Sequence, residues 1–128
     1  MKPDTLEWIE KAEEDWVMGL RGYRARKNPS YNAACFHAQQ CAEKYFKAKL
    51  IEAGIPVART HNLVAFILLL LPIEPNWRPL QPLARTLNVY AVDYRYPGNT
   101  ATKLNAKEAI AHCREIRKVV RLSFSLSV

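Results

Sequence analysis

The chain has 128 residues, of which 49% are hydrophobic and 24% charged, so it can form one apolar core and is not a disordered chain. Its formal net charge is +7, which favours a polyanion or an acidic protein as its partner. The charge is uneven, because residues 1–15 hold six acids and two bases while the remainder is strongly basic.

Cysteine usage and hydropathy indicate a reducing compartment and no membrane anchor. The chain has three cysteines, and this odd number argues against a disulfide framework. Acidic residues follow closely on Met1, so we expect no signal peptide. The apolar run Leu63–Leu71 is about half as long as a membrane-spanning helix. We therefore expect a cytoplasmic protein that does not enter a membrane.

Two long helices are predicted in the first half of the chain. Thr5 or Asp4 can cap the first helix, which we expect to end near Arg26. The second helix is predicted over Ser30–Ala53, with Gly54 as its C-terminal stop. Its early alanines allow close approach of another helix, so the two long helices are expected to pack as an antiparallel pair.

Two shorter helices are predicted next. His61-Asn62 opens the third, which should end before Pro72. The proline-rich stretch 73–82 is typical of an irregular connector. A fourth helix is expected over Leu80–Tyr94, because apolar residues recur on one of its faces at helical spacing.

The last predicted helix follows a loop over residues 99–104. Asn105 and Glu108 have the spacing of an N-cap and its capping-box partner, and the helix should run to Leu122. Residues 1–4 and 123–128 are expected to fray. With no convincing strand, the sequence predicts an all-α, up-and-down bundle of about five helices in a single domain over residues 1–128.

The segment Asp93–Gly98 places Arg95 between two tyrosines, Tyr94 and Tyr96, where Pro97 must end a helix. A guanidinium held beside aromatic rings is suited to an anion or a nucleotide. Arg95 could equally cap helix carbonyls and pair with Asp93. Both interpretations are open at this stage.

A basic stripe is predicted on the last helix, where four cations fall within about 80° of one another. It could follow a phosphate backbone, although charged helix faces are more often simply solvated. Its members are Lys107, Arg114, Lys118 and Arg121.

Three segments together resemble one known family. They are Phe36–Lys44 (FHAQQCAEK), Arg59–Leu63 (RTHNL) and Tyr94–Pro97 (YRYP). In their order and spacing they resemble a HEPN domain (higher eukaryotes and prokaryotes nucleotide-binding), over nearly the whole chain. The resemblance implies a small helical bundle that usually dimerises and has a role related to nucleotides or RNA. Prokaryotic members often act beside a minimal nucleotidyltransferase, as a toxin–antitoxin-like pair.

Many members of this family are metal-independent ribonucleases that carry Arg, four to six further residues and then His. After Arg95 the corresponding positions hold Thr100, Ala101 and Thr102, none of which can act as a base near neutral pH. The ribonuclease motif is therefore incomplete, and whether the chain is an enzyme stays open. Arg95 carries over as a candidate phosphate contact.

Further candidates lie near these motifs. His61 could serve as an acid or base, or pack structurally behind a Thr60 cap, and in a dimer it could approach Arg95. Glu43 could hold the Arg95 guanidinium or pair with Lys47 on the helix surface. The remaining residues that we single out are Lys44 of the family-like run, Gln39 and Gln40 as cross-helix hydrogen-bonding groups, and His37.

The three histidines lack metal-ligand spacing, so we expect no metal and no cofactor. Three functions remain. The first is a dimeric nucleotide- or RNA-related binding and regulatory module that works with a nucleotidyltransferase-like protein, with Tyr94, Arg95, Tyr96, Glu43 and Lys44 as ligand-binding candidates. The second is an atypical ribonuclease that uses Arg95 and His61. The third is a structural adaptor whose basic surface docks an acidic protein.

Overall fold

Five α-helices and one short 3₁₀ helix make up the computed structural model, which describes residues 1–128. In chain order they are α1 (Pro3–Arg24), α2 (Tyr31–Glu52), α3 (Leu63–Leu70), the 3₁₀ helix η1 (Pro75–Leu80), α4 (Gln81–Asp93) and α5 (Lys103–Ser123). No strand is present, so the predicted all-α bundle is confirmed. No helix is both long and apolar enough to cross a bilayer.

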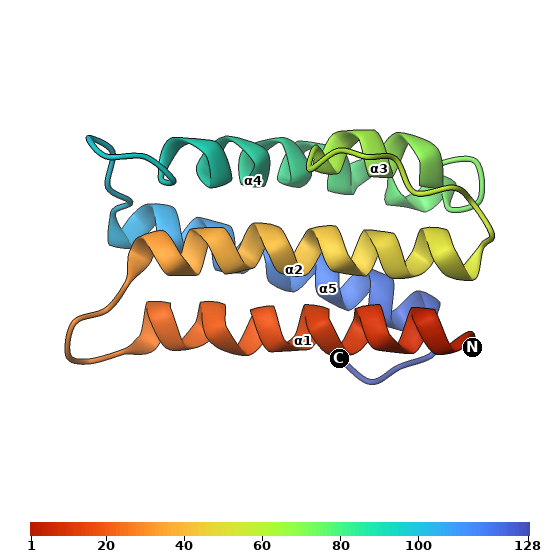
Figure 1. Cartoon of the computed structure of the whole chain (residues 1–128), viewed down its shortest axis with the longest axis horizontal. Coiled ribbons are helices and arrows are strands. Elements are labelled where there is room, and N and C mark those ends of the chain that lie inside the picture. The colour runs from red at the N-terminus through yellow and green to blue at the C-terminus, as the bar shows by residue number, and fades with distance from the viewer.

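Helix α2 is the centre of the bundle. It is the only helix that contacts all four of the others, and its contact with the antiparallel α1 is the most extensive in the molecule. In Figure 1, α1 lies on one side of α2, while α3 and α4 lie on the other and α5 runs behind. A residue on α2 can therefore face either the α1–α5 side or the α3–α4 side, depending on its helical position.

The sequence of α2 explains this central place. Its first half is lined with small buried residues such as Ala34, Ala38 and Cys41, which let neighbouring helices approach closely. Its second half buries the large rings of Tyr45 and Phe46 in the same core. All three cysteines of the chain are free and buried.

The turn between α1 and α2 is tight. The Ser30 backbone N–H donates to the Gly22 carbonyl at 2.9 Å, and a Cβ on Gly22 would lie only 2.8 Å from the Ser30 carbonyl oxygen. Glycine is therefore required for this approach. The Ser30 hydroxyl then caps α2 by accepting from the Ala33 N–H. At the other end of α2, Gly54 adopts a φ of 72°, which glycine tolerates without strain.

Three predicted details of the helices are wrong. Helix α1 begins at Pro3, and its N-cap Lys2 makes no side-chain capping bond. Thr5 is buried and does not cap the helix, because its hydroxyl donates to Glu52 at 2.9 Å. The stretch predicted as an irregular connector contains η1, since its prolines fit the φ of a 3₁₀ turn and Trp77 anchors it in the core.

The third correction concerns the start of α5. Its N-cap is Thr102 and not Asn105. The Thr102 hydroxyl accepts from the Asn105 N–H at 3.1 Å, while the Asn105 side chain accepts from the Thr102 N–H at 2.9 Å. Glu108 takes no part in this capping box and instead accepts a hydrogen bond from the Tyr90 hydroxyl.

Both ends of the chain, which the sequence predicted to fray, make contacts with the body of the molecule. The Lys2 backbone N–H donates to Glu52 at 3.0 Å. Phe124 and Leu126 pack against the core, and the Leu126 N–H donates to the Arg121 carbonyl at 2.9 Å. The bundle and its ends thus form one packed unit around α2.

Candidate functional site

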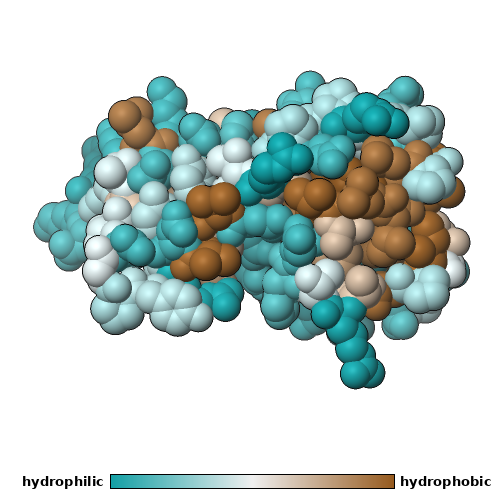
Figure 2. All heavy atoms as spheres, turned by 90° about the horizontal axis from the view of Figure 1, so that it is seen from above, coloured by the Kyte–Doolittle hydropathy of each residue, from teal (hydrophilic) through white to brown (hydrophobic).

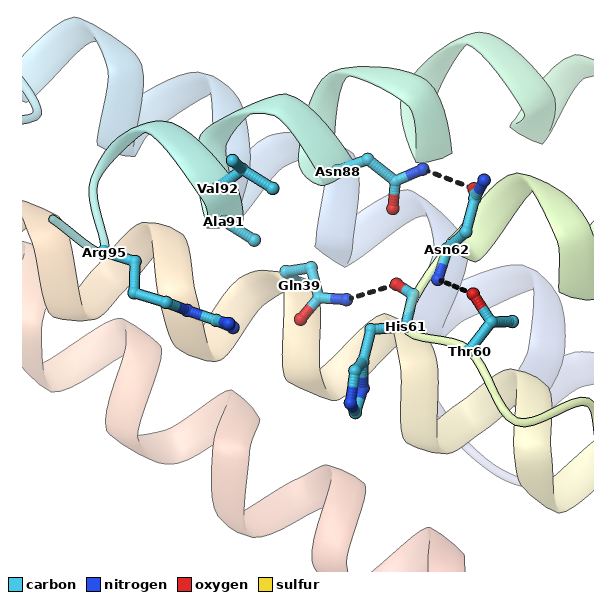
Figure 3. Close-up of a pocket in the computed structure, with 8 residues that line it drawn as sticks. All are labelled: Gln39, Thr60, His61, Asn62, Asn88, Ala91, Val92 and Arg95. Atoms are coloured by element: carbon cyan, nitrogen blue, oxygen red, sulfur yellow. Dashed lines mark hydrogen bonds between the residues drawn. The ribbon is translucent and has the colours of Figure 1, made fainter.

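A pocket of about 360 Å³ opens where α2, α4 and the segment before α3 meet. Figure 3 shows that polar side chains from all three of these parts of the chain converge on it. Its lining consists of Gln39 from α2, Thr60, His61 and Asn62 from the segment before α3, and Asn88, Ala91, Val92 and Arg95 from α4 and its C-terminal end.

Arg95 reaches this pocket because α4 ends just before it. The helix stops at Asp93, and Tyr94 forms its C-cap. The guanidinium caps no carbonyl and makes no ion pair with Asp93 or with any other acid of the chain. Arg95 is exposed, and in Figure 3 its guanidinium extends from the end of α4 toward Gln39. It is thus a cation at the pocket with no counter-charge of its own.

His61 lines the same pocket and is held by a buried carboxylate. Its Nδ1 lies 3.1 Å from Glu43 Oε1, and Glu43 is only 2% exposed although the imidazole itself is open to solvent. The other Glu43 oxygen accepts from Lys47 at 3.0 Å, which confirms the predicted i, i+4 pair. Glu43 makes no hydrogen bond to Arg95, so the predicted support of that guanidinium is replaced by support of His61.

Amide side chains hold the wall of the pocket in place through hydrogen bonds. Gln39 is buried and donates from Nε2 to both the His61 carbonyl and Glu43, each at 3.2 Å. Asn88 donates to the Asn62 side chain at 2.7 Å and accepts from the Leu63 N–H at 3.0 Å. These bonds join the start of α3 to α2 and α4, so the segment that carries His61 is held from both sides.

The charges around the pocket leave it suited to an anion. Glu43, the nearest buried acid, is already compensated by Lys47 and contacts His61. Arg95 remains uncompensated, and a guanidinium donates well to two oxygens of one phosphate or carboxylate. The neighbouring amides add neutral hydrogen-bonding groups around the same space.

A second hollow, of about 250 Å³, adjoins the first and shares Ala91 and Arg95 with it. Four of its eight lining residues carry a ring, namely Phe36, His37, Tyr90 and Tyr94, and we call it the aromatic hollow. The pKa of Tyr90 is raised above its ordinary value, mainly by partial burial and to a smaller degree by the hydrogen bond to Glu108. This phenol therefore stays neutral in the physiological range. Arg95 therefore stands between a polar hollow and an aromatic one.

The remaining ligand-binding candidates lie elsewhere. Tyr96 is 61% exposed and lines neither hollow. Lys44 donates to Asp15, which also accepts from His37 at 2.8 Å. The Lys44 ammonium group is thus engaged between α1 and α2, and Lys44 lines neither hollow.

The predicted basic stripe on α5 is smaller than expected. Lys107, Arg114 and Lys118 are exposed. Arg121 instead turns inward, donating to the Tyr45 hydroxyl at 3.0 Å and lying 3.4 Å from Glu13. Arg121 turns inward because the carboxylate of Glu13 on α1 attracts its guanidinium away from solvent.

Two lining residues, Val92 and Asn88, are not indicated by the sequence motifs, and the polar one of the two is Asn88. It stands on α4 seven residues before Arg95, two helical turns away and therefore on the same face. Thr60 and Asn62 were read only as helix-start residues. The sequence signal that could have indicated Asn88 is a polar side chain seven residues before Arg95, at helical spacing.

Comparison with known proteins gives consistent matches. The HEPN domain family matches residues 5–123. The crystal structure of TT1696 from Thermus thermophilus is similar with a TM-score of 0.77 at 22% identity, covering 94% of this chain and 98% of that one. The structure of ST0689, an archaeal HEPN homologue, gives a TM-score of 0.74 at 26% identity, covering 96% and 98%. No curated protein matches the chain in sequence.

Proposed function

The chain belongs to the HEPN domain family, and from this premise we propose that it is a binding module for nucleotides or RNA that holds a phosphate group at Arg95. The observation that carries the proposal is an unpaired guanidinium at a pocket lined by amides and an imidazole. Arginine is well suited to phosphate because its N–H groups can donate in parallel to two oxygens. The net charge of +7 supports a polyanionic ligand.

The test is binding of a labelled single-stranded RNA and of nucleoside monophosphates to the wild type and to Arg95→Gln. We expect the substitution to weaken binding of both ligands at least about tenfold, since a charged donor to phosphate is lost. Arg85→Gln is the matched control. Arg85 is an exposed arginine of α4, the helix that precedes Arg95, and it lines neither hollow. Equal affinities for the wild type and Arg95→Gln would contradict the proposal.

RNA cleavage is the second candidate, favoured by the Glu43–His61 pair at the same pocket as Arg95. With its Nδ1–H donated to Glu43, His61 has Nε2 free to take the proton of a ribose 2′-hydroxyl. The 2′-oxygen then attacks the adjacent phosphorus and the bond to the 5′-oxygen breaks, leaving a 2′,3′-cyclic phosphate. The departing oxygen takes a proton from water, and Arg95 stabilises the charge on the phosphoryl oxygens.

Incubation of the purified protein with RNA in the presence of a chelator separates the two candidates. For an enzyme, His61→Ala abolishes cleavage, and Glu43→Gln shifts the pH profile because Glu43 only positions the imidazole. His112→Ala is the control, since His112 lies on α5, has Glu108 as its ion-pair partner and lines neither hollow. Absence of cleavage by the wild type would remove the second candidate and leave the binding module.

We also propose that two copies of the chain associate. Leu68, Leu69 and Ile73 are large apolar side chains that remain 54%, 38% and 47% exposed. Figure 2 shows apolar residues gathered on the part of the surface where α3 lies. Burial of this patch would stabilise a pair of chains. Sedimentation of the wild type as a dimer and of Leu68→Glu as a monomer would support this pairing, whereas a monomeric wild type would contradict it.

The nucleotidyltransferase-like partner is part of the same proposal. It rests on the family resemblance, and the uneven charge of the chain is compatible with a charged protein partner. The test is co-expression with a nucleotidyltransferase encoded beside this chain, followed by co-purification at low and high salt. A complex that forms at low salt supports the pairing, and two proteins that elute separately under both conditions contradict it.

A further inference from the structure

The two hollows that meet at Arg95 differ in polarity, as the phosphate of a nucleotide differs from its base. One is lined by amides and His61, and the other by aromatic rings. We propose that the aromatic hollow is a nucleobase subsite, so that a bound nucleotide places its phosphate at Arg95 and stacks its base near Phe36, Tyr90 and Tyr94. This inference rests on the proposed function and adds the part of the ligand that gives selectivity.

The rings of the aromatic hollow are held in place before any ligand binds. The Tyr90 hydroxyl donates to Glu108 at 3.0 Å, and the Tyr94 hydroxyl donates to Asn105 at 2.9 Å. Both acceptors belong to α5, so α4 is tied to α5 through these two phenols. Rings that are already fixed lose little conformational entropy when a base stacks on them.

Helix α2 supplies the opposite wall. Phe36 is 40% exposed, although phenylalanine side chains are usually buried in a protein core. It packs edge-on against the His37 ring, with the two ring centroids 5.2 Å apart. His37 is fixed in turn, because its Nδ1 lies 2.8 Å from Asp15. An exposed ring on a rigid support is suited to stacking, which contributes about 1–3 kcal/mol per base in single-stranded nucleic-acid complexes.

One polar group could read the edge of the base. Asn32 lines the aromatic hollow, and its side-chain oxygen is already taken by the Ala101 N–H at 2.7 Å. This bond leaves the Asn32 NH₂ group as a donor without a partner in the chain. This donor can bind a carbonyl oxygen or a ring nitrogen on the edge of a stacked base.

The volumes agree with a small ligand that occupies both hollows. The phosphate-side pocket measures about 360 Å³ and the aromatic hollow about 250 Å³. Together they fall within the range of roughly 300–1,000 Å³ that is usual for sites of small ligands. A single nucleotide unit, free or at the end of an RNA strand, can thus reach from one hollow into the other across Arg95.

The experiment compares ligands with and without a base. The affinities of the four nucleoside 5′-monophosphates and of ribose 5-phosphate are measured by calorimetry for the wild type, Phe36→Leu and Tyr96→Leu. We expect at least one monophosphate to bind the wild type about tenfold more tightly than ribose 5-phosphate. Phe36→Leu, which keeps an apolar side chain but removes the ring, should abolish this advantage without changing the affinity for ribose 5-phosphate.

Tyr96→Leu is the matched control, because Tyr96 is an exposed aromatic residue that lines neither hollow. It should retain the full advantage of the nucleotide. Equal binding of nucleotides and ribose 5-phosphate to the wild type overturns the base subsite but leaves the phosphate site intact. An advantage that survives in Phe36→Leu also overturns it. If neither kind of ligand binds the wild type, the phosphate site and the base subsite both fail.

Discussion

The charged side chains on the two sides of α2 differ in whether they have ion-pair partners. Toward α1 and α5, acids and bases are paired with each other inside the chain. Toward α3 and α4, Glu43 is paired with Lys47 and His61, but the guanidinium of Arg95 is left without a partner. Under the proposed function, the paired residues contribute to stability and the unpaired guanidinium to binding.

The paired side is organised around Glu13 of α1. Its carboxylate accepts two hydrogen bonds from Arg117 of α5, at 2.7 and 2.6 Å, and one from the Tyr45 hydroxyl of α2. Arg121 adds a further positive charge 3.4 Å away. Three helices are thus joined at one carboxylate. Because every charged group in this cluster has a partner, none of them is available to a ligand.

The largest expected effect is therefore the loss of this cluster. Glu13→Ala leaves Arg117 and the Tyr45 hydroxyl without their partner in a partly buried place, and we expect it to lower the free energy of unfolding by about 2–3 kcal/mol. Urea denaturation measures the loss. Glu14→Ala is the control, since Glu14 is exposed and makes no ion pair, and its effect should stay within about 0.5 kcal/mol. Equal losses in the two variants would refute a special role for Glu13.

A smaller effect is expected from pH. Burial alone would raise the pKa of Glu13, but hydrogen bonds from Arg117 and Tyr45 and the charges of Arg117 and Arg121 outweigh it and lower this pKa below its ordinary value of 4.5. The stabilisation is therefore complete above about pH 4.5 and disappears as the pH falls through the lowered pKa. Urea titrations at pH 7 and pH 3 should show that the advantage of the wild type over Glu13→Gln narrows in acid. A constant advantage would speak against this ionised pair.

The smallest effect on stability is expected on the unpaired side. Arg95→Gln should change the free energy of unfolding by no more than about 0.5 kcal/mol, because Arg95 is exposed and makes no ion pair. The same variant should lose ligand affinity, so stability and binding respond to different arginines. A loss of stability comparable to that of Glu13→Ala would show that Arg95 has a structural role and would remove the contrast between the two sides.

Much of the fold could be predicted from local sequence signals. The cap at Ser30 and the stop at Gly54 place α2 to within a residue, and the Asn62 side chain caps α3 by accepting from the Val64 N–H. The start of α5 is harder to predict, because Thr102 and Asn105 are both residue types that suit an N-cap. In the structure Thr102 is the N-cap, and Asn105 is its capping-box partner and accepts from the Tyr94 hydroxyl.

The candidate site was less predictable. Local motifs indicate Arg95 and His61 separately, and from the sequence they are expected to meet only in a dimer. In the structure they line one pocket of a single chain. This arrangement depends on how α4 packs against α2, which no local pattern reports. The role of Glu43 was missed for the same reason, because its partner His61 lies beyond the turn that follows α2.

The double attachment of the segment before α3 has a consequence for how the chain can vary. Gln39 holds the His61 carbonyl and Asn88 holds the Asn62 side chain, so the imidazole is positioned by α2 and α4. In the preceding stretch 54–59, Ile55, Val57 and Ala58 pack against the core, while Pro56 and Arg59 are exposed. Replacements at these two exposed positions should therefore be tolerated, with the imidazole staying in register while the surface beside the pocket acquires new chemistry.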